Sequence, residues 1–257
     1  MEKKYLFFDI DGTLTDRSTG EIVPSAREAL TRLEENGHFV AIATGRAHYK
    51  ARKFTDANGF KNMVCCGGNG CVIDNELVEN IPLDKDGCIK IIHQAEELGY
   101  GWCVALDDTK DVYMTDDKFL RQVGKRKEPT RYIIDDMLEV EKADAIYKVY
   151  VAIPKEDEEK LTTKELVGHL RFEPEYLMFQ PDNKRGGIIK MMEHLNADIK
   201  DVVVFGDDYN DMDMFCPEWF SIAMGNACQD LNDIANYVTD SNVDDGIKNA
   251  CEHFGWI

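Results

Sequence analysis

Short, continuous runs of apolar residues, separated by stretches with helical periodicity, most constrain how this chain can fold. The first three runs lie within Tyr5–Asp9, Phe39–Ala43 and Asn62–Cys66. Helical patterns separate them, over Pro24–Asn36 and Ala47–Asn58. A strand that is apolar along its whole length is buried on both faces, which is typical of a parallel sheet covered by helices on both sides. The sequence therefore predicts an α/β fold with a doubly wound, Rossmann-like parallel sheet.

The pattern changes near residue 83 and returns near residue 181. In the middle segment the predicted strands come in pairs, and apolar residues intermix with polar ones. Such strands are typical of an antiparallel sheet with helices on one face. The elements expected there are helices at Gly87–Leu98 and Lys155–Val167, and strands at Trp102–Leu106, Val112–Met114, Ala145–Ile153, Leu170–Phe172 and Leu177–Gln180.

After the middle segment the first pattern resumes. The elements expected there are helices at Gly187–Leu195, Asp211–Cys216 and Asp244–Cys251, and strands at Val202–Phe205 and Trp219–Ala223. We therefore expect a core domain formed by residues 1–82 and 182–257. An α+β domain, residues 83–181, interrupts this core.

Composition excludes several classes of partner. The net charge of −19 argues against nucleic acid and against an anionic membrane, since both are bound by basic patches. No run approaches the roughly 20 apolar residues of a membrane span, and no signal-peptide pattern is present. The eight cysteines are spread along the chain, which indicates reduced thiols and a cytoplasmic protein. Cys66 and Cys71 lack the second ligand pair of a zinc site, so we expect buried or loop thiols.

Polar segments follow three of the predicted core strands. They are Asp9–Thr13, then Thr44, Gly45 and Arg46, and then Gly206–Asp211. In a parallel sheet all three emerge at the same edge, where open α/β sheets bind ligands. Carboxylates gathered there raise one another's pKa, and a hard divalent cation such as Mg2+ would relieve the repulsion.

The residues that would meet at this edge suit phosphoryl transfer. The set comprises carboxylates, a hydroxyl group at Thr44 and a cation at Lys184, where the chain returns from the insertion. In that reaction positioning and charge neutralisation supply most of the catalysis.

Each segment taken alone also has a simpler interpretation. The Asp9–Thr13 segment fits a solvated turn or a helix N-cap in a chain with 49 acidic residues. Gly206–Asp211 fits an acidic turn, although it lacks the spacing of an EF-hand Ca2+ loop. Thr44 and Gly45 fit an N-cap and a turn. The combination, in this order and at three strand ends, favours a catalytic site.

Together these segments resemble the four motifs of the haloacid dehalogenase superfamily. The matching residues are Asp9-x-Asp11-Gly12-Thr13, Thr44-Gly45-Arg46, Lys184, and Gly206-Asp207-x-x-Asn210-Asp211. The insertion between the second and third motifs is similar to the type IIB (C2B) cap of the Cof-like hydrolases. Asn69-Gly70 and Ala223–Ala227 are also similar to stretches of that group. One departure is Arg185, where the family often has glycine after the lysine.

The resemblance implies a role for each motif. Asp9 would attack phosphorus and form an aspartyl-phosphate, and Asp11 would act as general acid and base. Mg2+ would be held by Asp9, Asp11 (through its backbone carbonyl), Asp207 and Asp211. Phosphate or substrate would be bound by Thr44, Gly45, Arg46, Lys184 and Asn210. Asn210 and Asp211 would also orient Lys184 and the metal's waters.

The reaction implied is Mg2+-dependent hydrolysis of phosphomonoesters of small metabolites, such as sugar phosphates. Two alternatives stay open: a sugar phosphomutase or phosphotransferase that uses the same nucleophile, and a binding module without catalysis. In the insertion, Arg121, Arg126 and Arg131 with Tyr132 could face a phosphorylated substrate or form a solvated basic loop. The sequence carries no indication of oligomeric state.

Overall fold

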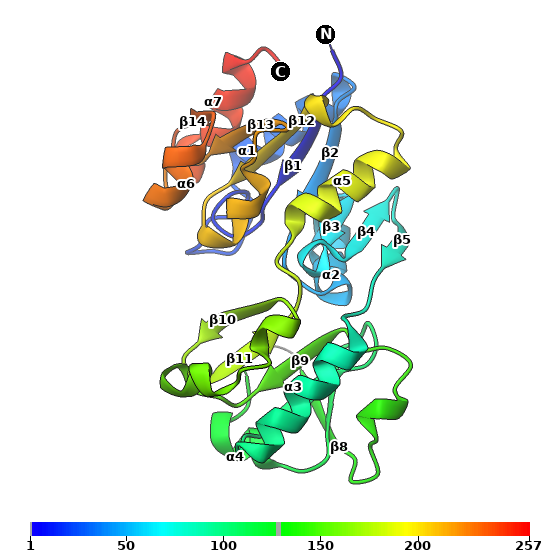
Figure 1. Ribbon diagram of the computed structural model, residues 1–257. Coiled ribbons are helices and arrows are strands. Elements are labelled where there is room, and N and C mark those ends of the chain that lie inside the picture. The colour runs from blue at the N-terminus through cyan, green and yellow to red at the C-terminus, as the bar shows by residue number, and fades with distance from the viewer. Residues whose placement is uncertain (1, 127–129) are drawn as a thin grey trace. The chain divides into compact units, whose positions relative to one another are not determined.

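The computed structural model describes residues 2–126 and 130–257 and divides into two compact units (Figure 1). The first, here the core unit, comprises Met1–Arg46, Lys53–Glu79 and Asn183–Ile257. The second, here the insert unit, comprises Ala47–Arg52 and Asn80–Asp182. Each unit is built around its own sheet.

The core sheet confirms the predicted parallel arrangement. Its strand order is β14-β13-β12-β1-β2-β3-β4-β5, and the strands from β14 to β3 are parallel. The strands span, in chain order, Tyr5–Phe8 (β1), Phe39–Ala43 (β2), Met63–Cys65 (β3), Gly70–Ile73 (β4), Glu76–Asn80 (β5), Val202–Gly206 (β12), Phe220–Ala223 (β13) and Tyr237–Val238 (β14). β1 lies between β12 and β2, so the segments that follow these three strands are neighbours.

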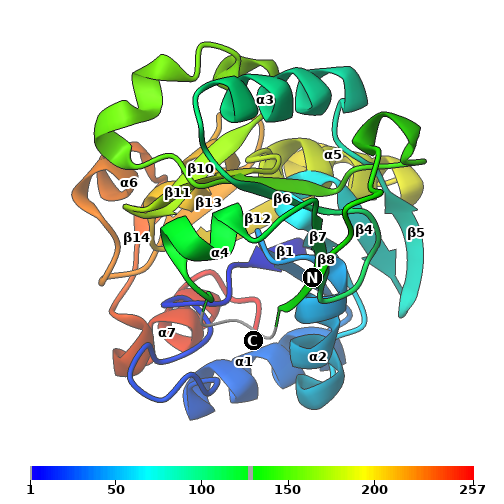
Figure 2. The ribbon, with the colours of Figure 1, turned by 90° about the horizontal axis from the view of Figure 1, so that it is seen from below.

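Helices cover both faces of the core sheet, which the continuous apolar strands predict. They are α1 (Pro24–Glu35), α2 (His48–Asn58), α5 (Lys184–His194), α6 (Gln229–Ile234) and α7 (Gly246–His253). Phe7 and Val204 pack with Ile188 and Met191 of α5 and with Leu231 of α6. On the other side of the strands, α1 packs against α7 and β2 (Figure 2).

The hairpin formed by β4 and β5 was missed by the sequence analysis. β4 runs antiparallel to β3, at the edge of the otherwise parallel sheet. Asp74 and Asn75 form the turn with φ values of +50° and +67°. Left-handed residues at both positions are typical of a type I′ hairpin turn, and Asp and Asn tolerate them best after glycine.

The insert unit contains a mixed, mainly antiparallel sheet with the order β10-β11-β9-β6-β7-β8. Among the strand pairs of its described residues, only β7–β8 is parallel. The strands span Trp102–Ala105 (β6), Asp111–Met114 (β7), Arg131–Ile134 (β8), Lys148–Val151 (β9), His169–Glu173 (β10) and Tyr176–Phe179 (β11). The α/β core with an α+β insertion is therefore the fold class that the sequence predicts.

The insert sheet has a helix on each face, which corrects the expectation of helices on one face. Ile91 and Ile92 of α3 (Lys85–Glu97) pack beside Val104. Phe119 of α4 (Lys118–Val123) packs beside Cys103, which points to the opposite face from Val104. The pattern of the sequence did not predict α4, which is only six residues long.

The predicted helix at Lys155–Val167 is wrong. This segment forms two short 3-10 turns, at Lys155–Lys160 (η3) and Lys164–Leu166 (η4). The backbone and hydroxyl of Thr163 both donate to Gln94 Oε1 of α3, at 2.9 and 2.7 Å. These tertiary hydrogen bonds satisfy groups that a continuous helix would use, so they override its helical propensity.

Three further 3-10 turns, at Cys66–Gly68 (η1), Val140–Lys142 (η2) and Ile199–Asp201 (η5), connect elements, as does η7 at Asn242–Asp244. The helix predicted at Asp211–Cys216 is also a 3-10 turn, at Tyr209–Met214 (η6). Within the described parts of the chain, no helix has both the length and the apolar character that crossing a bilayer requires.

Candidate active site

Three predicted motifs meet at one edge of the core sheet. Asp9 follows β1, Thr44 follows β2 and Asp207 follows β12. All three side chains are buried, with Asp9 at 6% exposure and Asp207 at 2%. Parallel pairing of β1 with both neighbours places these positions together, because their carboxyl ends are aligned.

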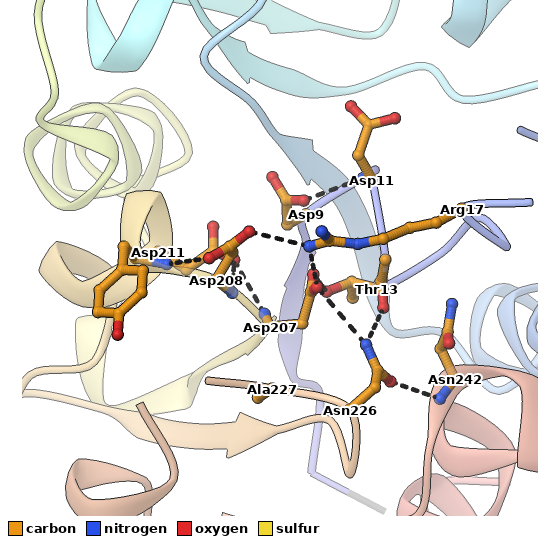
Figure 3. A network of polar contacts seen from close by, with 12 residues as sticks. Asp9, Asp11, Thr13, Arg17, Asp207, Asp208, Asp211, Asn226, Ala227 and Asn242 are labelled. Atoms are coloured by element: carbon orange, nitrogen blue, oxygen red, sulfur yellow. Dashed lines mark hydrogen bonds and ion pairs between the residues drawn. The ribbon is translucent and has the colours of Figure 1, made fainter. Parts of the chain in front are cut away.

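A cluster of buried carboxylates forms the centre of the site (Figure 3). One oxygen each from Asp9, Asp207 and Asp211 lies within 4.8 Å of the others. The resemblance implies side-chain metal ligands from Asp9, Asp207 and Asp211, and the structure gathers all three. The fourth expected ligand is the backbone carbonyl of Asp11, whose side chain lies outside this group.

Lys184 neutralises part of this negative charge. Its Nζ donates to Asp9 Oδ1 at 2.7 Å and to Asp211 Oδ1 at 2.5 Å. The lysine begins α5, whose N-cap Asn183 accepts a hydrogen bond from the Gly186 amide. Burial by itself would lower the pKa of Lys184, but the two carboxylates outweigh it and raise the pKa. Lys184 therefore stays a cation.

Lys184 only partly compensates the negative charge around Asp9. Asp9 Oδ2 accepts the Asp11 backbone amide at 3.0 Å. Burial, together with the nearby charge of Asp211, raises the pKa of Asp9 to about 7, although Lys184 acts in the opposite direction. One lysine is thus not enough to keep the cluster fully ionised at neutral pH.

Asp207 is held by residues from the loop that follows β1. Thr13 Oγ1 donates to Asp207 Oδ1 at 2.8 Å, and Arg17 Nη2 donates to Oδ2 at 2.6 Å. Burial raises the pKa of Asp207, and these two hydrogen bonds partly offset the rise.

Asp11 projects to the rim of the site. Its side chain is 64% exposed, and both of its oxygens accept from Arg46 Nη2 at 2.7 Å. Two carboxylates two residues apart therefore have different surroundings: Asp9 is buried against a lysine, and Asp11 is accessible. This difference suits one as a nucleophile and the other as an acid or base.

Thr44, Gly45 and Arg46 lie beside a backbone turn. The Cys66 amide donates to the Arg46 carbonyl at 2.8 Å, and the Thr44 hydroxyl accepts from the Arg46 amide at 3.2 Å. Cys66 has a φ of +54°, a left-handed conformation that is uncommon outside glycine and asparagine. A tight turn at Cys66 therefore borders the second motif.

Asp211 organises the loop after β12. Its Oδ2 accepts the backbone amides of Asp207 and Asp208 at 2.9 and 3.2 Å, which forms a capping box at η6. Asn210 is half-buried, and its side chain has no hydrogen-bond partner in the described part of the chain. The structure therefore connects Asp211, and not Asn210, to Lys184.

Arg185 leaves the backbone of the third motif intact. Its side chain points to the surface and pairs with Glu218, and its amide donates to Asp213 Oδ2 at 2.9 Å. The position that cannot take a larger side chain is Gly187. A Cβ there would lie 2.4 Å from Val64 Cγ1 and 2.8 Å from Gly68 Cα.

A model of the haloacid dehalogenase-like hydrolases matches residues 6–250 of the chain. The chain belongs to this family. The fold, the order of the four motifs and their meeting at one sheet edge agree with that membership.

Relatives across the family are named as phosphatases. The chain is 30% identical to YkrA of Bacillus subtilis, named as a phosphatase without a stated substrate, over 100% of both chains. It is 28% identical to the pyridoxal phosphate phosphatase YbhA of Escherichia coli, over 96% of this chain and 97% of YbhA. The structure also resembles the subclass IIB sugar phosphatase BT4131, with a TM-score of 0.77 and 25% identity, over 99% of this chain and 100% of BT4131. These comparisons support a phosphoric monoester hydrolase.

The carboxylate cluster fits a hard divalent cation, which haloacid dehalogenase-like enzymes generally use. Asp9, Asp207 and Asp211 offer oxygen ligands, which Mg2+ prefers. Burial and the charge of Asp211 raise the pKa of Asp9, and a cation at the cluster would act in the opposite direction. When bound, such an ion would neutralise charge on the phosphoryl oxygens.

Several residues that build the site were not assigned roles by the sequence analysis. Asn226 Nδ2 donates to the Gly12 carbonyl at 2.9 Å, and its Oδ1 accepts the Asn242 amide at 2.9 Å (Figure 3). Asn242 Nδ2 in turn donates to the Thr15 carbonyl at 2.9 Å. These bonds fix the loop after β1 from the opposite end of the chain. Asn226 lies in the stretch Ala223–Ala227, which is similar to the family. No local sequence pattern indicated a role for Asn242 or Arg17.

The candidate basic patch of the insert unit consists of paired arginines. Arg121 lies 3.1 Å from Asp117, and Arg131 pairs with Asp111. Arg126 packs its guanidinium 3.7 Å from the centre of the Tyr150 ring and donates to the Tyr132 hydroxyl at 3.3 Å. Each of the three arginines thus has a partner within the insert unit. The segment 127–129 lies outside the described residues.

Proposed function

We propose that this chain is a Mg2+-dependent phosphatase that works through an aspartyl-phosphate on Asp9. The observation that carries the proposal is the pairing of buried Asp9 with Lys184 inside a carboxylate cluster, with Asp11 exposed two residues later. A buried, counter-charged carboxylate suits nucleophilic attack, and an accessible one suits proton transfer to and from solvent and substrate.

The chemistry assigns one step to each aspartate. A carboxylate oxygen of Asp9 attacks phosphorus, and the bond from phosphorus to the ester oxygen breaks. Asp11, protonated, gives its proton to the leaving alkoxide. Asp11 then takes a proton from water as the water oxygen attacks the phosphorus of the aspartyl-phosphate, which releases inorganic phosphate and restores Asp9.

Other residues orient these groups. Lys184 holds Asp9 Oδ1 and would bind a phosphoryl oxygen beside it, while the Thr44 hydroxyl would donate to another. The Arg46–Asp11 salt bridge must open before Asp11 acts as an acid. Arg46 is then free to bind the substrate, as the sequence predicts for it.

For the substrate we propose a small phosphorylated metabolite, with sugar phosphates as the first class to test. Support comes from the relatives, which are named for pyridoxal phosphate and sugar phosphate hydrolysis. We further propose that residues 83–181 act as the cap, which would exclude water and contact the organic part of the substrate.

A panel of phosphomonoesters with purified protein and Mg2+ tests the proposal. We expect phosphate release from at least one sugar phosphate or similar metabolite, and loss of the release in EDTA. Asp9→Asn should lower kcat by roughly three orders of magnitude or more, because the nucleophile is lost. Asp233→Asn, which removes an exposed carboxylate from α6, is the matched control and should keep full activity.

A chemical trap makes the test specific for the intermediate. Rapid quenching during turnover should recover phosphate bound to the wild-type protein and none bound to Asp9→Asn. Full activity in Asp9→Asn, or no release from any compound of the panel, would contradict the proposal.

A further inference from the structure

Arg17 occupies a position at the carboxylate cluster that neither the motifs nor the proposed reaction explains. Its Nη2 donates to Asp207 Oδ2 at 2.6 Å and to Asp208 Oδ2 at 3.0 Å (Figure 3). The arginine side chain is 58% exposed, whereas that of Asp207 is 1% exposed. A surface cation therefore reaches inward to a buried carboxylate.

The backbone provides the space for this contact. A Cβ at Gly12 would lie 2.5 Å from Arg17 Nε and 2.3 Å from Asp207 Oδ2. The guanidinium thus packs directly against the Cα of Gly12. The glycine that shapes the nucleophile loop also admits the arginine.

Arg17 and Lys184 neutralise different carboxylates of the site. Lys184 serves Asp9 and Asp211, while Arg17 serves Asp207 and Asp208. Asp207 is shared between two sets of groups, because it also belongs to the three-carboxylate cluster. A divalent cation at that cluster would need the Asp207 carboxylate that Arg17 holds.

A divalent cation and the Arg17 guanidinium at the same carboxylate would repel each other, and the burial of Asp207 limits the screening between them. Arg17 has a second partner to which it can withdraw. Asp208 is 42% exposed and is not one of the clustered carboxylates. Its contact with the guanidinium can persist when the contact with Asp207 is lost.

We propose that Arg17 is a built-in competitor of the metal ion. It neutralises Asp207 while the site is empty of metal, and it transfers to Asp208 alone when a divalent cation binds. The inference rests on the proposed Mg2+ site and goes beyond it, because it assigns to Arg17 a weakening of metal affinity. The protein would then bind Mg2+ reversibly, and its metal-free form would be stabilised.

Isothermal titration of Mg2+ into metal-stripped, full-length protein tests this directly, without any substrate. We expect Arg17→Gln to bind Mg2+ about tenfold more tightly than the wild type, since a charge-assisted hydrogen bond no longer has to be broken. Arg32→Gln is the matched control. Arg32, on α1, also faces two carboxylates, Glu28 and Glu252, at 3.8 and 3.2 Å, and neither belongs to the carboxylate cluster of the site. The Mg2+ affinity of Arg32→Gln should equal that of the wild type.

Asp208→Asn tests the second half of the inference. Without its alternative partner, Arg17 should hold Asp207 more firmly, so Mg2+ affinity should fall several-fold. In the Arg17→Gln background, Asp208→Asn should change Mg2+ affinity much less, because no arginine is left to compete with the metal for Asp207.

The outcomes separate this inference from the proposed function. If wild type binds Mg2+ and Arg17→Gln binds it equally or more weakly, the inference is wrong and the metal site stands. If neither protein binds Mg2+, the metal site itself is wrong, and the inference is wrong with it. Should Arg17→Gln fail to fold, Arg17→Lys replaces it, because a single ammonium group cannot serve both carboxylates as well. We expect Arg17→Lys to bind Mg2+ with an affinity between those of wild type and Arg17→Gln, and unchanged affinity would overturn the inference.

Discussion

Gly12 connects the nucleophile loop to the metal-ligand candidates at the scale of a single residue. Its φ is +97°, and its Cα lies against both Asp207 and Arg17. A left-handed backbone conformation and a crowded Cα both require glycine, but for separate reasons. The same loop contains Gly20, which has a φ of +73° and open space around its Cα.

This pair of glycines allows the two requirements to be measured separately. We expect Gly20→Ala to lower the free energy of unfolding by about 1–2 kcal/mol, the cost of the left-handed conformation. Gly12→Ala should cost roughly 2–5 kcal/mol, since overpacking is added to that strain. Urea unfolding of both variants gives the values. Gly12→Ala should also lose Mg2+ affinity, which Gly20→Ala keeps, and equal effects in the two variants would argue against crowding at Gly12.

At the scale of elements, the start of the core sheet depends on a buried histidine. His38 precedes β2, and its Nδ1 accepts the Lys4 backbone amide at 2.9 Å, just before β1. The ring also hydrogen-bonds to the backbone of Trp256, near the C-terminus. Because Nδ1 must accept, the ring is neutral, with its proton on Nε2. Burial lowers the pKa of His38, and the nearby charge of Lys4 contributes.

The lowered pKa predicts how stability changes with pH. The unfolded chain binds a proton at this histidine near pH 6.5, whereas the folded chain does so only at lower pH. Stability supplied by neutral His38 is therefore present above about pH 6.5 and is lost as the pH falls below it. Urea unfolding at pH 7, 6 and 5 should show a smaller loss for His38→Gln than for wild type. The control His194→Gln, at the exposed end of α5, should lose as much stability with falling pH as the wild type does. An equal loss in His38→Gln would refute the assignment of this pH dependence to His38.

Elements whose periodicity agrees with their tertiary contacts were predicted correctly. The helix at Pro24–Glu35 and the strand at Phe39–Ala43 have the predicted type and nearly the predicted bounds. The segment at Lys155–Val167 was assigned wrongly, because its turns are stabilised by Gln94 of a distant helix. Local propensity contains no information on a hydrogen bond between residues that are 69 positions apart, as Thr163 and Gln94 are.

At the scale of the whole molecule, negative charge dominates. The chain has a net charge of −19, and its three clustered carboxylates are buried in the core unit. General screening by salt and specific binding of a cation should both stabilise such a protein. Only specific binding depends on the carboxylate cluster.

Thermal unfolding in Mg2+ distinguishes these two effects. At about 100 times its dissociation constant, a ligand that binds only the folded state adds about 2.7 kcal/mol of stability. We therefore expect a higher unfolding temperature in Mg2+ than in NaCl of equal ionic strength, and reversal by EDTA. Asp207→Asn should respond equally to the two salts, and an equal response in wild type would show screening alone.

The fold class, the family and the residues that meet at the site were predictable from local patterns in the sequence. Apolar runs of strand length and motifs at strand ends are local patterns, and parallel pairing brings strand ends together whatever the side-chain details. Asp9, Thr44 and Asp207 could be named for that reason, and Lys184 from its place in the four motifs. The tertiary structure decided which of these side chains are buried and how their charges are balanced. Arg17 and Asp207 are 190 residues apart in the chain, so their contact depends on packing that no local pattern encodes.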